Sequence, residues 1–120
     1  MKYMLLIYGN EELWQSFPQE DLARVIAETD ALNADLRRSG EFIGAYGMAD
    51  QEMAKQVSVR EGNRVVTDGP YIEAKEYIGS FTLVDCETPE RAYEIAALNP
   101  FSKVGVVEVR PIMHEADPET

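Results

Sequence analysis

The sequence has few of the residues on which metal, redox and nucleophile chemistry depend. Among 120 residues there is one cysteine, Cys86, and one histidine, His114. A single cysteine forms no internal disulfide, which favours a reducing compartment. One histidine and one cysteine far apart in the chain do not make a zinc site, and no carboxylate spacing is that of a recognised calcium or magnesium loop. We therefore expect no metal and no cofactor.

Positive charge and long apolar runs are also scarce. The chain has 11 basic against 22 acidic residues and a formal net charge of -11, so it would repel phosphate backbones and anionic lipid. The apolar run 3–8 ends at Gly9, before the roughly 7–15 apolar residues of a signal peptide are reached, and no run approaches the ~20 residues of a membrane span. We expect a cytoplasmic protein without nucleic-acid or membrane partners.

What the chain does have is enough apolar material for one core. Hydrophobic residues make up 45% of the sequence, and 120 residues leave no room for a second core. We expect a single domain over residues 1–113. The acidic tail 114–120 has no apolar anchor and is predicted to be flexible.

The first half of the chain reads as strand, helix and strand. The apolar run 3–8 predicts a buried strand, and residues 9–15 are interpreted as a polar loop. Ser16 and Gln19, three residues later, have the spacing of a helix-capping box. They predict the start of an amphipathic helix of about 20 residues that ends at Gly40. Residues 42–48 follow as a strand.

The second half adds a hairpin and a second strand, helix and strand. Residues 49–55 are interpreted as a loop or a single turn, and strands 56–60 and 64–67 are joined by a tight link at 61–63. A strand at 78–85 leads to a helix that Thr88 would cap and that ends near Asn99. Residues 104–112 are expected to form the last strand.

This order predicts an α+β fold, a ferredoxin-like split βαβ repeat with a central β-hairpin. Two helices cover one face of such a sheet, while the first and last strands look apolar on both faces. We expect the second face to be covered by another copy, in a homodimer with the form of a dimeric α+β barrel. A small molecule would bind between sheet and helices or between the two sheets.

The densest run of chemically useful side chains is RVVTDGPYIEAKEYIGSF, at residues 64–81. Asp68 precedes a Gly-Pro pair, so its carboxylate would either cap the turn or point into a cleft as a catalytic acid or base. Glu73 and Glu76 are three residues apart beside Lys75. These three would bind a polar ligand or form a solvated loop; a third alternative is a hard-cation site formed by the two glutamates with Asp68.

Two further kinds of residue are candidates for the ligand site. Arg64 would bind a carboxylate in a bidentate way, or pair with one of the many acids. Tyrosines would line a cleft and offer hydroxyls, although strand aromatics commonly belong to the core. These tyrosines are Tyr8, Tyr46, Tyr71 and Tyr77.

The same run carries a family resemblance. The residues VTDGPY at 66–71, then Glu73, Lys75 and IGSF at 78–81, resemble the signature of the DGPF branch of the YCII-related proteins, with Tyr71 in place of the usual Phe. The opening strand MKYMLLI and the closing strand VEVRPI are similar too, so the likeness covers nearly the whole chain. It implies a dimeric α+β barrel and a small, bacterial, cytoplasmic protein.

The resemblance implies less about the reaction. Related barrels include monooxygenases and isomerases that act without metals, and some relatives are encoded beside extracytoplasmic-function sigma factors. The His–Asp pair proposed for the other branch is not carried over, because nothing around His114 matches it. We expect a small-molecule-binding protein, with a metal-free acid–base reaction as an extension. The alternative is a non-catalytic regulatory or protein-interaction domain, so whether the protein is an enzyme stays open.

Overall fold

The computed structural model describes residues 1–72 and 75–117, which leaves Glu73 and the last three residues of the predicted tail outside the described range. The described elements are β1 (Lys2–Gly9), α1 (Glu11–Ser16), α2 (Gln19–Ser39), β2 (Phe42–Gly47), η1 (Gln51–Met53), β3 (Lys55–Arg60), β4 (Asn63–Asp68), β5 (Tyr77–Asp85), α3 (Pro89–Leu98), η2 (Pro100–Lys103) and β6 (Val106–Pro111). The chain is thus α+β, as predicted.

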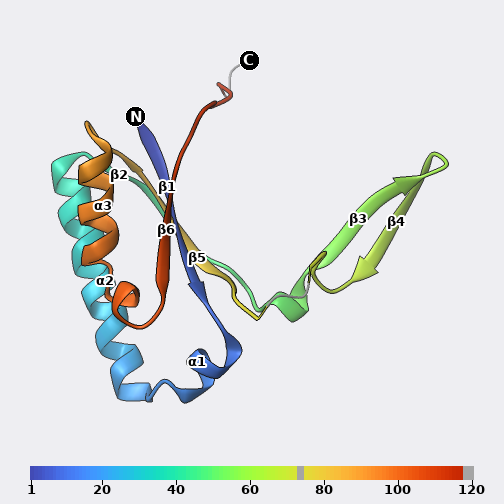
Figure 1. Ribbon diagram of the computed structural model, residues 1–120, viewed down its shortest axis with the longest axis horizontal. Coiled ribbons are helices and arrows are strands. Elements are labelled where there is room, and N and C mark those ends of the chain that lie inside the picture. The colour runs from blue at the N-terminus through green and yellow to red at the C-terminus, as the bar shows by residue number, and fades with distance from the viewer. Residues whose placement is uncertain (73–74, 118–120) are drawn as a thin grey trace.

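Four strands form one antiparallel sheet in the order β2-β5-β1-β6. Two βαβ halves interleave to give this order, because β1 and β5 occupy the centre and the strand that follows each helix lies at an edge. The ferredoxin-like prediction is confirmed. Helices α2 and α3 lie on one side of the sheet in Figure 1.

The core lies between the sheet and these two helices. Alternate residues of β1 face it, and Tyr3 and Leu5 are 2% and 3% exposed. They pack with Val84 of β5, Leu36 of α2 and Ile95 of α3. Burying a side chain of this size stabilises the fold by about 1.5–3 kcal/mol.

The other face of the sheet carries no helix, and we call it the open face. By register it includes Met4, Leu6, Tyr8, Phe81 and Leu83 on the two central strands. At its edge, β6 places Glu108 opposite Leu6 and Arg110 opposite Met4. The prediction that the last strand is apolar on both faces is therefore wrong at these two positions.

The polar loop predicted at 9–15 is in large part the short helix α1. The side chain of Asn10 accepts a hydrogen bond from the Leu13 N–H at 2.7 Å and caps this helix. Ser16 ends it, since its hydroxyl donates to the Leu13 carbonyl at 3.1 Å. The predicted cap of the long helix at Ser16 is wrong for this reason. Helix α2 begins at Gln19 and ends at Ser39, and its C-cap is Gly40, whose φ of 81° is left-handed as expected.

Strands β3 and β4 form a second, two-stranded sheet. Glu61 and Gly62 have φ values of 52° and 78°, which are the positive values that a tight two-residue hairpin turn requires. The predicted hairpin is confirmed. In Figure 1 it projects from the side of the sheet opposite to the helices, and we call it the arm.

Helix α3 begins as predicted, with the Thr88 hydroxyl accepting the Arg91 N–H at 3.2 Å. Among the helices in the described residues, none combines the length and the apolar composition needed to cross a membrane.

Candidate functional site

The structure disperses the site residues predicted from the run 64–81, which we call the corner motif. Asp68 and Arg64 lie on the arm, and the Asp68 side chain is 89% exposed and ion-paired with Lys55 on the facing strand. Tyr71 is 87% exposed. The catalytic role of Asp68 stays a prediction, and its carboxylate bonds to an ammonium group rather than to the backbone of the turn.

The remaining predicted residues lie nearer the main sheet. Tyr46 of β2 packs against Phe81 on the open face, with ring centroids 5.2 Å apart. Glu76 accepts a hydrogen bond from the Asn10 side chain at 2.9 Å. Lys75 is exposed, and Glu73 lies outside the described residues.

A hollow of about 420 Å³ opens where the main sheet meets α1, and we call it the aromatic hollow. Four segments supply its walls: α1, the stretch after β2, the start of β5 and η2. Its lining residues are Trp14, Met48, Ala49, Asp50, Tyr77, Gly79, Ser80 and Phe101. These walls are mostly apolar, with a few polar groups, as in sites for small ligands.

Two strand glycines place Trp14 in this hollow. A Cβ at Gly9 would lie 2.3 Å from the indole ring, and one at Gly79 would lie 3.2 Å from it. The indole therefore packs directly on the backbone of β1 and β5; the approach at Gly9 leaves no space for a Cβ, and the one at Gly79 leaves little. Phe101 meets it edge to face, with centroids 5.5 Å apart and an interplanar angle of 75°.

Acidic side chains surround the polar groups of the aromatic hollow. Burial raises the pKa of Tyr77 above its usual 10.0, and the charges of Asp50, Glu11 and Glu52 raise it further. The Tyr77 hydroxyl consequently stays protonated at neutral pH and is a hydrogen-bond donor. Asp50 accepts the Glu52 N–H at 3.0 Å. The site would favour neutral or cationic ligands over anions.

A second hollow, of about 520 Å³, lies where β1 ends and β6 begins, and we call it the carboxylate hollow. Glu76 and Glu108 line it together with Tyr8 and Asn10, while Leu13 and Val106 are among its apolar walls. Glu76, which was predicted as a ligand residue, thus lines the carboxylate hollow. Its hydrogen bond to Asn10 already uses one carboxylate oxygen.

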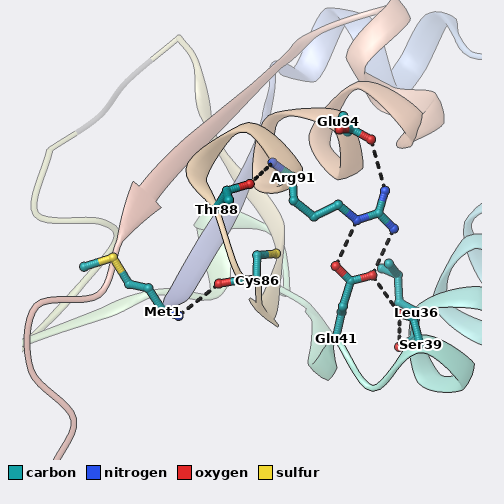
Figure 2. Close-up of polar contacts among 8 residues, drawn as sticks. All are labelled: Met1, Leu36, Ser39, Glu41, Cys86, Thr88, Arg91 and Glu94. Atoms are coloured by element: carbon teal, nitrogen blue, oxygen red, sulfur yellow. Dashed lines mark hydrogen bonds and ion pairs between the residues drawn. The ribbon is translucent and has the colours of Figure 1, made fainter.

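A third hollow, of about 460 Å³, lies at the far end of the sheet around Arg91. Figure 2 shows the Arg91 guanidinium reaching from α3 to the carboxylate of Glu41, with two N–H···O distances of 2.9 Å. A third bond goes to Glu94 at 3.2 Å. The bonds from Arg91 and the Ser39 hydroxyl lower the pKa of Glu41. Because these charges satisfy one another, we read this group as a structural clamp and not as a ligand site.

Within residues 1–72 and 75–117, no three His, Cys, Asp or Glu side chains come together in a way that could hold a metal ion. The side chains that line the aromatic and carboxylate hollows can form hydrogen bonds, stack on a ring and transfer protons.

Sequence reasoning missed most of the aromatic hollow. Tyr77 was named as a possible cleft wall, but Trp14, Asp50 and Phe101 were not named. The sequence did contain one indication of this hollow. Trp14 is the single tryptophan of the chain, and a side chain of this size is usually packed against other residues and not left in a polar loop.

Comparison with known proteins gives a consistent result over the whole chain. The sequence model of the YCII-related domain matches residues 1–116. An uncharacterised protein of Rhizobium meliloti (strain 1021) is 27% identical over 114 residues, which cover 93% of this chain and 92% of the relative.

Proposed function

The chain belongs to the YCII-related domain family, and from that premise we propose that it is a cytoplasmic protein that binds a small, neutral or cationic, ring-containing molecule in the aromatic hollow. The observation that carries this proposal is the convergence of Trp14, Tyr77 and Phe101 from three separate segments around one hollow. Rings from distant elements gathered around an open space are typical of ligand sites.

The polar groups of the hollow would orient such a ligand. The protonated Tyr77 hydroxyl would donate to a carbonyl or hydroxyl oxygen, and the Asp50 carboxylate would accept from a hydroxyl or ammonium group. One acceptor and one donor in the same hollow are also the pair that a metal-free acid–base reaction needs. Proton transfer between ligand and Asp50 is the reaction class that we propose.

The proposal includes a homodimer formed through the open face. Met4, Leu6, Phe81 and Leu83 form an apolar centre on this face, with Tyr46 at its edge. A sheet face of this kind is stable in water when a second layer covers it, and the same face of a two-fold related copy fits it in size and character.

The binding proposal is tested with three ligands of equal ring size and different charge: benzylamine, benzyl alcohol and benzoate. Trp14 is the single tryptophan of the chain and lines the hollow, so its fluorescence reports occupancy directly. We expect saturable quenching by benzylamine and benzyl alcohol. Benzoate should bind at least about 10-fold more weakly, since an anion faces like charge in the hollow.

Two variants connect the signal to the hollow. Asp50→Asn should weaken benzylamine binding about 10- to 100-fold, because a hydrogen bond to a charged group is lost. Tyr77→Phe should weaken the binding of benzyl alcohol, because the donor to its oxygen is lost. The matched control Tyr93→Phe should not, since Tyr93 is 55% exposed on α3 and does not line the hollow. Equal binding of all three compounds, or no effect of Asp50→Asn, would refute the proposal.

A second function is favoured by the surface charge. A net charge of -11 suits contact with a basic protein partner in a non-catalytic, regulatory role. In that case the three ring compounds would not quench Trp14, while a basic partner would bind with an affinity that falls steeply with salt.

A further inference from the structure

The arm carries an apolar face with nothing packed on it in the described chain. Val57 faces Val66 across the hairpin, and Val59 follows on the same side, opposite Arg64. Their side chains are 64%, 53% and 71% exposed. A two-stranded hairpin is at best marginally stable alone in water and needs a third strand or another surface. The valine face of the arm therefore lacks the layer that would stabilise it.

The shape of the molecule indicates how much surface is left uncovered. The radius of gyration is 16.7 Å, against about 13.6 Å expected for a compact domain of this length. The accessible surface is 8795 Å², about 2,300 Å² more than the roughly 6,500 Å² of a compact monomer of this mass. Each partner of an obligate homodimer buries about 1,000–2,500 Å². The excess accessible surface of this chain is therefore as large as the surface that one subunit buries in such a dimer.

The charge of the arm differs from that of the body. It has three basic residues (Lys55, Arg60 and Arg64) and two acidic ones (Glu61 and Asp68), so it carries +1 in a chain of -11. Lys55 pairs with Asp68, whereas Arg60 and Arg64 form no ion pair in the part of the chain that the structure describes. A surface that is complementary to this arm is acidic, as the body of a second copy is.

We propose that the arm clasps a second copy of this chain, with the valine face packed on the partner and Arg64, which lies on that face, directed to its acidic surface. The proposal rests on the homodimer proposed above. The arm projects on the side of the open face, so a copy that covers this face lies beside it (Figure 1). By two-fold symmetry each subunit gives one arm and receives one.

The test compares opposing pairs on the two faces of the arm. Val57→Thr/Val66→Thr places hydroxyls on the valine face, and Ser58→Thr/Val65→Thr changes the opposing pair on the other face. Both variants have the β-branched residue threonine at every changed position, so strand propensity is not lowered. Sedimentation velocity over a dilution series would measure the dimer dissociation constant. We expect at least a 100-fold increase for the first variant, because four hydroxyls per dimer enter an apolar contact, and less than about threefold for the second.

The possible outcomes separate this proposal from the others. Wild-type protein that stays at 13.5 kDa at every concentration would overturn both the homodimer and the arm. A dimer that the valine variant leaves unchanged, or that both variants weaken equally, would overturn the arm alone. Trp14 emission and far-ultraviolet circular dichroism confirm that each variant is folded. Benzylamine titration of the same samples tests the aromatic hollow independently.

Discussion

Neutralising one partner of the Arg91 clamp should lower stability far more than neutralising an ion pair on the surface. Glu41 and Arg91 have side chains 17% and 35% exposed and share two hydrogen bonds of 2.9 Å. Exposed pairs contribute about 0–1 kcal/mol, and breaking a buried pair costs about 3–5 kcal/mol. For this half-buried pair we expect Glu41→Gln to reduce the free energy of unfolding by about 2 kcal/mol at pH 7.

The control is an ion pair of the same chemistry that stays in solvent. Asp35 and Arg38 of α2 are 68% and 71% exposed, so Asp35→Asn should cost less than about 1 kcal/mol. Urea unfolding followed by Trp14 emission gives both values. A loss of 2 kcal/mol would shift the midpoint by about 1 M. Equal shifts for the two variants would refute the assignment of Arg91 and Glu41 as a clamp.

The pH dependence checks the same argument. The pKa of Glu41 is lowered from 4.5 in the folded protein, with the hydrogen bond from Arg91 as the largest cause. A carboxyl group whose pKa is lower in the folded than in the unfolded protein stabilises the fold. This stabilisation is fully present above pH 4.5 and is lost as the pH falls through the pKa of the folded state. The difference between wild type and Glu41→Gln should therefore be largest near neutral pH and shrink in acid. A difference that persists unchanged well below pH 4.5 would contradict this origin.

Two further predictions concern the packing. Gly9→Ala should displace the Trp14 indole and shift its fluorescence emission to longer wavelength, and overpacking should lower the free energy of unfolding by about 1–3 kcal/mol. The control is Gly47→Ala, where the new methyl group has no neighbour within 4 Å in the described residues, so the Trp14 emission should stay unchanged. Cys86 is 3% exposed, and burial raises the pKa of its thiol. Its reaction with a disulfide reagent at pH 8 should be at least about 100-fold slower in native than in urea-unfolded protein, and similar rates would show that the thiol is accessible.

The parts of the fold that local chemistry determines could be predicted from the sequence. Gly40 ends a helix because it adopts a positive φ, and Thr88 starts one because its hydroxyl caps the first turn. Gly62 marked the hairpin in the same way. Helix α1 could not be predicted, since six residues hold little helical propensity and depend on the Asn10 cap and on the packing of Trp14.

The candidate site was harder to predict because it is assembled from distant segments. Trp14, Asp50 and Phe101 are far apart in sequence, and no spacing connects them before the chain folds. The corner motif, residues 64–81, is a local pattern and favoured the first interpretation, yet its Asp68 lies on the exposed arm. Tyr77 belongs to both descriptions, because it lies within residues 64–81 and also lines the aromatic hollow at the start of β5.

The base of the arm makes the hairpin separable from the rest of the protein. The Gly69 N–H donates to the Ala54 carbonyl at 2.9 Å, so the chain enters and leaves the arm at neighbouring points. A tight turn that joins these two residues would delete the hairpin and retain both Asp50 and Tyr77. If the arm clasps a second copy and the aromatic hollow binds a ligand, as proposed above, insertions or losses between residues 54 and 69 would change the association and leave the hollow intact. The two proposed properties would then be separable by changes to the arm alone.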